Sequence, residues 1–362
     1  MKNKKKILII SPSLGFGGAE RNLINISNFL SKNFDVDFFN LQKREEIIEL
    51  SSLSKKINFK QFNFKRTIFS LSKISSFIKK KNYDYIITSS INLNFYLVLI
   101  KYFVNQKFKL ILRESNYPIK SYKSLTSIFN IIFRLFYFGA DKLIVQNNTI
   151  KNYLIKNFFV DKKKIKVVSN LIDIKYIKKK ASEKLKVFNN KKKNQKIIVN
   201  VASLNEQKNQ IEILRAFKNL KNYKYDFKLL LIGDGKDKEK LKKYIKNHNL
   251  KNISFLGNLS NPYKYIKNSD LMILSSKWEG MPNVLLEAQC LDVKCISSDC
   301  YTGPRELKQK GFDISLYKSG NYNDLVKKIK KHFKFKRLNK SKIKILNKLN
   351  DQSKMSIKSI LK

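Results

Sequence analysis

The chain has 362 residues, more than a single hydrophobic core usually serves, so its length favours two domains of about 100 to 200 residues each. Hydrophobic residues make up 43% and charged residues 28% of the chain, which excludes disordered and fibrous proteins. Lys and Arg total 76 against 27 Asp and Glu, a net charge of +49 that favours anionic partners: phosphates, anionic lipid headgroups or nucleic acid. A biased composition that places lysine on solvated faces is an equally good explanation of part of this charge.

Short apolar strands alternate with amphipathic helical stretches in the first half, beginning with a strand at 6–11 and a helix from about Gly18 to Leu30. Further strands are expected at 35–40, 83–90, 108–115 and 141–148. The alternation starts again at 196–203 and continues through 227–235, 252–258, 270–276 and 293–299. This pattern predicts an α/β protein with two Rossmann-like domains, each a parallel sheet covered by helices.

Residues 175–195 are rich in Lys, Asn and Ser and have weak apolar periodicity, so we expect the connection between the domains there. An N-terminal domain then covers residues 1–180 and a C-terminal domain covers 181–340. From Tyr322 onward, apolar positions at helical spacing predict helices that are exposed on one side.

The segment GFGGAER at 15–21 follows the first strand and opens a helix. Gly17 and Gly18 let backbone N–H groups approach an anion at the helix N-terminus, which is a phosphate-binding geometry. The spacing is neither that of a dinucleotide fingerprint nor that of a P-loop. A tight turn with no ligand is the alternative.

The segment EGMPNVLLEA at 279–288 follows the strand at 271–276 and enters a helix, with Pro282 expected at the first helical position. Glu279 then lies on the loop and Glu287 lies within the helix, and both can face a ligand above the strand ends. One carboxylate can accept hydrogen bonds from two ribose hydroxyls, and the other from hydroxyls of a transferred sugar. The alternative is that an acidic residue is simply favoured by the helix dipole.

With these two motifs, the chain resembles the retaining family 4 glycosyltransferases of the GT-B fold over nearly its whole length. Weaker matches in the same order support the resemblance: Gln207-Lys208, Gly233-Asp234-Gly235, Phe255-Leu256-Gly257, Asn170 with Asp173, and Gly303-Pro304-Arg305-Glu306. The family implies two domains facing a central cleft, with the acceptor on the N-terminal domain and the nucleotide sugar on the C-terminal domain. It also implies that the final helix, 341–362, packs back on the N-terminal domain.

The resemblance assigns the catalytic roles to Lys208, on the donor diphosphate, and to Glu279, on the donor sugar. It implies that Glu287 binds the ribose and that the loop from Gly257 to Leu259 flanks the base. The full set of donor-binding candidates is Gly17, Gly18, Lys208, Gly257, Leu259, Glu279, Gly280, Met281, Pro282, Asn283 and Glu287. The acceptor-side candidates are Glu20, Arg21, Arg113, Glu114 and Asn116.

Two positions depart from the family pattern: Ser203 stands where an arginine is usual, and Ser115 where a histidine is frequent. The two histidines of the chain, His248 and His332, are expected at a helix end and in the basic tail. A histidine base is therefore not expected. The family mechanism does not need one, because the departing phosphate oxygen takes the proton of the acceptor.

No cofactor and no metal are expected, because Asp35-Val36-Asp37, the formal match to a metal-binding DxD, alternates along a predicted strand. Cys290, Cys295 and Cys300 form no CxxC pair, which excludes a zinc site or a disulfide framework and suits a reducing cytoplasm. No stretch reaches about 18 uninterrupted apolar residues, so membrane contact would be peripheral, at the inner face of the cytoplasmic membrane. The candidate segments for this contact are 64–81 and 125–138. For the second segment, core packing as an ordinary crossover helix is the favoured interpretation.

The expected function is transfer of a hexose or N-acetylhexosamine from a UDP-sugar to a glycan acceptor, lipid-linked, in bacterial surface polysaccharide synthesis. The stretch from Ser298 to Glu306 resembles relatives that use UDP-linked sugars. The alternatives are a GT-B nucleotide-sugar epimerase and a non-catalytic nucleic-acid-binding protein. The second alternative has no RNP, KH or zinc-finger pattern, so no specific nucleic acid is expected as a partner.

Overall fold

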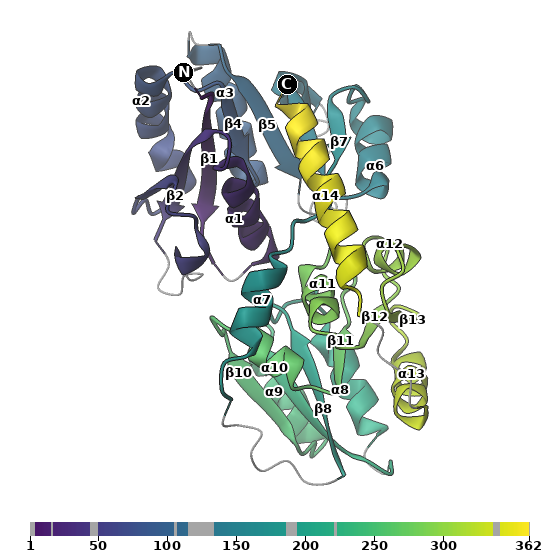
Figure 1. The fold of residues 1–362 in the computed structure, drawn as a ribbon. Helices are drawn as coiled ribbons and strands as arrows, with labels where there is room; N and C mark the ends of the chain where they lie inside the picture. The colour runs from purple at the N-terminus through teal and green to yellow at the C-terminus, as the bar shows by residue number, and fades with distance from the viewer. Residues whose placement is uncertain are drawn as a thin grey trace. The chain divides into compact units, whose positions relative to one another are not determined.

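The computed structural model describes residues 4–15, 17–43, 50–104, 107–114, 134–185, 194–220, 223–335 and 341–361. The chain divides into two compact units: unit 1 is Met1–Leu171 with Leu349–Lys362, and unit 2 is Ile172–Lys348. Each unit is built on a parallel β-sheet with helices packed on it (Figure 1). The two-sheet α/β architecture predicted from the sequence is confirmed.

Among the described residues of unit 1, seven strands form one sheet in the order β3-β2-β1-β4-β5-β6-β7. Its strands are β1 (Lys6–Ser13), β2 (Asp35–Gln42), β3 (Ile57–Gln61), β4 (Tyr85–Thr88), β5 (Lys109–Glu114), β6 (Lys142–Val145) and β7 (Ile165–Val167). Its helices include α1 (Gly18–Leu30), η1 (Leu50–Ser52), η2 (Thr67–Ser70), α2 (Leu71–Lys81), α3 (Ile91–Phe103), α6 (Asn148–Phe158) and most of α14 (Ile343–Ile360). Residues 134–139 are also helical.

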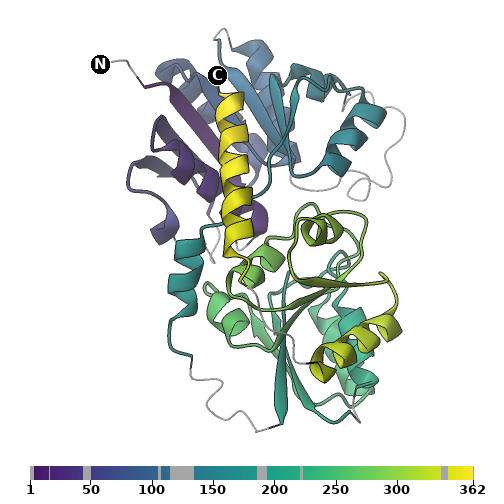
Figure 2. The ribbon, with the colours of Figure 1, turned by 45° about the vertical axis from the view of Figure 1, so that its right-hand side comes forward.

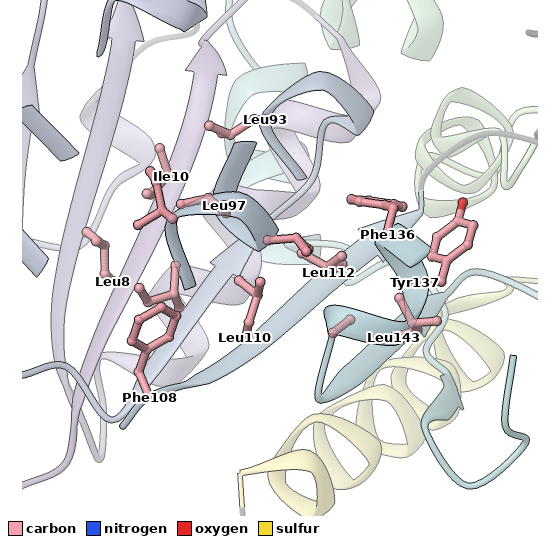
Figure 3. Close-up of a cluster of buried hydrophobic side chains, with 14 of the residues drawn as sticks. Leu8, Ile10, Leu93, Leu97, Phe108, Leu110, Leu112, Phe136, Tyr137 and Leu143 are labelled. Carbon is pink, nitrogen blue, oxygen red and sulfur yellow. The ribbon is translucent and has the colours of Figure 1, made fainter. Parts of the chain in front are cut away.

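The sheet of unit 1 buries both faces because successive side chains of a strand point to opposite sides. Leu8 and Ile10 of β1 pack into one cluster with Leu93 and Leu97 of α3, as Figure 3 shows. The alternate residues of β1 pack into a second cluster with α1 and α14. Helices α3 and α14 therefore cover opposite faces of this sheet.

The end of the chain belongs to unit 1. Ile357, Ile360 and Leu361 are buried in the same cluster as α1, and the Tyr85 hydroxyl donates a hydrogen bond to the carbonyl of Leu361. Figure 2 shows α14, in yellow, running along this unit. The part of the chain that returns to unit 1 is Leu349–Lys362.

Among the described residues of unit 2, six strands form one sheet in the order β10-β9-β8-β11-β12-β13. Its strands are β8 (Gln195–Val201), β9 (Asp226–Ile232), β10 (Ile253–Gly257), β11 (Leu271–Leu274), β12 (Cys295–Ser298) and β13 (Ile314–Tyr317). Its helices include α7 (Ile174–Ala181), α8 (Gln210–Lys218), α9 (Lys238–Asn247), α10 (Tyr263–Lys267), α11 (Asn283–Cys290), α12 (Pro304–Gln309) and α13 (Tyr322–Lys334). Helices α8, α9 and α13 pack on one face of the sheet.

Helix α7 occupies the first part of the segment that the sequence predicts to be an irregular connection. The side chain of Asp173 accepts a hydrogen bond from the backbone N–H of Tyr176, which caps the helix at 2.9 Å. Ile177 and Ala181 are buried, and α7 contacts α10 and α11. This packing makes α7 part of unit 2, so the division of the chain falls after Leu171.

Candidate functional site

In unit 2 the strand order reverses between β8 and β11, because β9 and β10 lie to one side of β8 while β11 to β13 lie to the other. Open α/β sheets bind ligands beyond the carboxyl ends of the strands at such a switch point. The loops 202–209 and 275–282 leave β8 and β11 at this point and carry Lys208 and Glu279. Two residues that are far apart in the sequence thus reach the same place.

Lys208 and Glu279 form an ion pair at this edge of the sheet. The Lys208 ammonium (Nζ) donates to Glu279 Oε1 at 2.6 Å, and the Ser276 hydroxyl donates to the same oxygen, also at 2.6 Å. The Glu279 side chain is 6% exposed, whereas that of Lys208 is 21% exposed. Since an ammonium carries three donors, Lys208 can bind a second anion while it stays near Glu279.

Hydrogen bonds between the two loops hold this pair in place. The Ser275 hydroxyl donates to the carbonyl of Lys208 at 2.8 Å, and the Gln207 amide donates to the carbonyl of Trp278 at 2.9 Å. In return, the backbone N–H of Lys277 donates to the carbonyl of Gln207 at 2.7 Å. Sequence reasoning identified the Gln207-Lys208 pair but missed Ser275 and Ser276, whose only local signal is a pair of small polar residues at a strand end.

A third loop packs directly on the segment 280–282. Gly303 has φ +89, and a Cβ at this position would lie 2.8 Å from Pro282 Cδ and 3.0 Å from the carbonyl oxygen of Gly280. Only glycine fits such a close approach at a positive φ. Helix α11 begins at Asn283, so Pro282 is the N-cap residue and not the first helical residue that the sequence predicts.

The other residues of the EGMPNVLLEA segment are buried around the start of α11, except Val284, which is half-buried. Glu287 is 3% exposed within the helix, and Met281 and Asn283 are 6% and 8% exposed. The Thr302 hydroxyl donates to the backbone carbonyl of Glu279. The positive end of the α11 dipole therefore lies at the same edge as Lys208, which favours an anion there.

Gly257 lies farther along this edge, at the end of β10. It has φ +66, and its carbonyl accepts a hydrogen bond from the N–H of Gly233 at 2.7 Å. Leu259 follows two residues later and is half-buried. Strands β10 and β11 are separated by β9 and β8 and lie about 14 Å apart; Gly257 is the last residue of β10, and Glu279 is on the loop that follows β11.

In unit 1, the glycine loop opens α1 as predicted, with Gly17 as the N-cap residue and Gly18 as the first helical residue. Glu20 lies over this loop, because a Cβ on Gly17 would be 2.0 Å from Glu20 Oε2. The backbone N–H of Arg21 donates to the carbonyl of Gly17 at 3.2 Å. A carboxylate thus lies at the helix N-terminus, where the sequence predicts a phosphate.

Arg113 ties together the carboxyl ends of several strands of unit 1. Its guanidinium donates to the Ser89 hydroxyl at 2.8 Å and to Asn170 Oδ1 at 2.7 Å, and the Gln146 amide donates to that same Oδ1 at 3.2 Å. Arg113 is 1% exposed, and burial lowers its pKa to about 10. These buried hydrogen bonds connect the carboxyl ends of β4, β5 and β6.

Glu114, the next residue, is also buried. The Asn94 amide donates to its Oε1 at 3.3 Å. Burial raises the pKa of Glu114 to about 7, although Asn94 and the charge of Arg113 act in the opposite direction. The last acceptor-side candidate, Asn116, lies outside the described residues.

Within the described ranges, no group of three or more His, Cys, Asp or Glu side chains could hold a metal ion. Asp37 of the DxD segment is paired with Lys81 at 2.9 Å and accepts a hydrogen bond from Asn58 at 2.9 Å. His248 is the C-cap residue of α9, as the sequence predicts, and His332 Nε2 lies 3.3 Å from the carbonyl oxygen of Asp270 at the opposite edge of the sheet. Neither histidine reaches the Lys208–Glu279 pair.

Two family models match the chain. The model described as Glycosyltransferase Family 4 matches residues 16–176, and the model described as Glycosyl transferases group 1 matches residues 181–346. An uncharacterised glycosyltransferase of Methanocaldococcus jannaschii is 33% identical over 311 residues, which cover 82% of this chain and 75% of that protein. The N-acetylgalactosamine-N,N'-diacetylbacillosaminyl-diphospho-undecaprenol 4-alpha-N-acetylgalactosaminyltransferase of Campylobacter jejuni is 29% identical over 315 residues, 84% and 83% of the two chains.

Among solved structures, that of Anabaena HepE in complex with UDP-glucose is similar to this chain with a TM-score of 0.80. The match covers 98% of this chain and 99% of the Anabaena chain at 17% identity, so it shows a common fold. The chain has the GT-B fold and belongs to the family 4 glycosyltransferases.

Proposed function

We propose that the protein is a retaining transferase that moves a hexose or N-acetylhexosamine from a UDP-sugar to a lipid-linked glycan in bacterial surface polysaccharide synthesis. The observation that carries this proposal is the Lys208–Glu279 pair at the switch point of the unit 2 sheet. The printed name of the Campylobacter relative gives that enzyme a diphospho-undecaprenol acceptor, and the Anabaena structure contains UDP-glucose. Both support the same substrate classes for this chain.

The edge of unit 2 suits a donor that lies extended along it. Lys208 and the start of α11 supply positive charge for the diphosphate, and Glu279 accepts hydrogen bonds from hydroxyls of the sugar. Glu287 binds the two ribose hydroxyls, and the base lies toward Gly257 and Leu259. The separation of about 14 Å between β10 and β11 leaves room for a base at one end and a sugar at the other.

The reaction forms a bond between the acceptor oxygen and the anomeric carbon, and breaks the bond from that carbon to the diphosphate. The acceptor proton passes to the departing phosphate oxygen on the same face, which gives retention. The electron pair of the broken bond leaves with the phosphate, so negative charge grows beside Lys208. Electrostatic stabilisation by that cation and positioning of the two substrates then supply most of the rate.

The acceptor is expected on unit 1, where Glu20 and Arg21 lie at the start of α1. Arg113 and Glu114 are buried just below that edge, so they position the strand ends. The enzyme needs no cofactor and no metal, and it works at the cytoplasmic face of the membrane. Activity that disappears in EDTA and returns with Mn²⁺ would contradict the metal-independent part of this proposal.

A panel of UDP- and GDP-sugars tests the donor by thermal stabilisation, since a ligand at 100 times its Kd adds about 2.7 kcal/mol of stability. The stabilising donor is then incubated with a diphospho-undecaprenol-linked glycan, and the anomeric configuration of the product is read by NMR. An α-linked product from an α-linked donor supports retention, and a β-linked product excludes it. Epimerisation of the donor in the absence of acceptor would identify the protein as an epimerase.

A further inference from the structure

Helix α3 is mostly apolar, with Asn92, Asn94 and Lys101 as its polar residues, yet one of its sides faces solvent. Leu93 and Leu97 point into the core of unit 1 (Figure 3). On the other side, Phe95 and Leu99 are 38% and 41% exposed. At the C-terminal end of the helix, Tyr102 and Phe103 are 66% and 82% exposed. A helix that is hydrophobic all round is normally buried in protein or lipid, so the outer side of α3 lacks the cover that its sequence requires.

The neighbours of α3 extend this apolar surface. The helical segment 134–139 lies against α3, since a Cβ on Gly139 would be 2.5 Å from Val98 Cγ1 and 3.4 Å from the Tyr102 ring. Segment η2 also contacts α3. Both neighbours present exposed apolar side chains of their own. We call the whole set the α3 surface: Ile68, Phe69, Phe95, Leu99, Tyr102, Phe103, Leu135 and Phe138.

Basic side chains lie at the part of the α3 surface that segment 134–139 contributes. The ammonium of Lys164 lies 4.9 Å from the centre of the Phe138 ring, and the guanidinium of Arg134, on the same helical segment as Phe138, lies 4.2 Å from the centre of the ring of Phe159, another exposed residue. Residues 60–109, which include η2 and α3, contain nine lysines and one arginine against one acidic residue, Asp84. Exposed aromatic rings among cations match the interface of an anionic bilayer, whose headgroups attract basic side chains.

We propose that the α3 surface is the site at which this protein docks on an anionic membrane, with the rings of α3 in the interface and the lysines on the headgroups. A second copy of the chain is a poorer partner, because it would bring the same dense positive charge to the contact. In the described ranges, no helix is long and apolar enough to cross a bilayer. Docking is therefore peripheral, with the side chains of one helix face in the headgroup region.

The sequence pointed to only part of this surface. The expected segment 64–81 contributes Ile68 and Phe69, and the described end of 125–138 contributes Leu135 and Phe138. The sequence does not identify α3 as a surface helix, because the signal of such a helix is a polar face opposite an apolar one, and α3 has few polar residues. The biological purpose of docking rests on the proposed lipid-linked acceptor, whereas the binding itself does not.

The test is sedimentation of the full-length protein with vesicles of phosphatidylcholine and phosphatidylglycerol, without donor or acceptor. The Tyr102→Ser/Phe103→Ser double variant should bind at least tenfold more weakly than the wild type. Met355→Ser is the matched control, since Met355 is 64% exposed on α14, which covers the opposite face of the sheet. This control should bind within twofold of the wild type.

Three results would overturn the proposal. In the first, the wild type does not bind anionic vesicles at low salt. In the second, the double variant binds vesicles as tightly as the wild type does. In the third, the wild type is a dimer in solution and the double variant is a monomer. The last result would assign the α3 surface to a second copy. If the double variant does not fold, Phe138→Ser, on the neighbouring segment, makes the same measurement with one exposed residue changed.

Tryptophan fluorescence reports the depth of the contact. The chain has one tryptophan, Trp278, so Phe103→Trp adds a single new signal on α3. Its emission should shift to the blue with anionic vesicles and be quenched by brominated lipid, whereas Met355→Trp should show neither effect.

Transfer to a water-soluble acceptor analogue should be unchanged in the double variant. If the wild type transfers the sugar but does not bind vesicles, the docking proposal is wrong and the proposed function stands. If the wild type binds vesicles but transfers no sugar, the proposed function is wrong and the docking proposal stands.

Discussion

The Glu279→Gln substitution separates two effects of one carboxylate, its hold on Lys208 and its contact with the donor sugar. In the ligand-free protein, Glu279 Oε1 accepts hydrogen bonds of 2.6 Å from both Lys208 and Ser276. A diphosphate that binds Lys208 must share this cation with the carboxylate. Glutamine keeps an oxygen acceptor of the same shape and removes the negative charge.

The expected change in UDP affinity follows from the geometry. Two anions bound to one ammonium lie about 5 Å apart, and two unit negative charges at that separation repel by roughly 3 kcal/mol at an effective dielectric constant of about 20. Water reaches Lys208, whose side chain is 21% exposed, so we expect about half of this energy. Glu279→Gln should therefore lower the Kd for UDP by about tenfold, which corresponds to about 1.4 kcal/mol.

Turnover should change in the opposite direction, since the glutamine amide accepts weaker hydrogen bonds from the sugar hydroxyls in the transition state. We expect kcat to fall by at least tenfold, about 1.4 kcal/mol of transition-state stabilisation. Calorimetry of UDP binding and steady-state kinetics measure the two effects. Glu206→Gln is a matched control, because Glu206 pairs with Lys277 at 3.0 Å on the same two loops but is 68% exposed, so UDP affinity should not change. A loss of UDP affinity in Glu279→Gln as large as in Lys208→Ala would refute this reasoning.

Three further predictions concern single side chains. Lys208→Ala should raise the KM for the donor and lower kcat together, because negative charge grows on the leaving phosphate in the transition state. Adding Ser203→Arg to this variant should partly restore both constants. If the double variant folds but is not rescued, another basic residue already neutralises the phosphate. Glu287→Ala should weaken binding of UDP and of the UDP-sugar alike, by about 1.5 to 3 kcal/mol for each lost charge-assisted hydrogen bond in calorimetry, and unchanged UDP affinity would remove the ribose role. Burial raises the pKa of Glu114 from 4.5 to about 7, so its contribution to stability is complete below about pH 4.5 and is lost as the pH rises through 7. Glu114→Gln should therefore gain up to about 3 kcal/mol relative to the wild type between pH 4.5 and 8 in urea unfolding, and a difference that is constant with pH would contradict the raised pKa.

Local patterns in the sequence determined the elements and much of the site. The helix predicted from Gly18 to Leu30 has these bounds in the structure, because a glycine loop before it and a regular apolar stripe along it are both local features. The same is true of the EGMPNVLLEA segment, which enters a helix as expected. The family also follows from motif order along the chain, since order and spacing are properties of the sequence alone.

Tertiary structure alone decided which of these residues meet. Lys208 and Glu279 are 71 residues apart and pair because the strand order of the sheet reverses between β8 and β11. Glu20 lies over Gly17, and Arg113 donates hydrogen bonds to Ser89 and Asn170. The spacing of these residues in the sequence predicts none of these contacts. The exposed side of α3 has the same cause: an apolar helix looks the same in sequence whether both of its sides are buried or one faces solvent, and only the packing of the sheet on it distinguishes them.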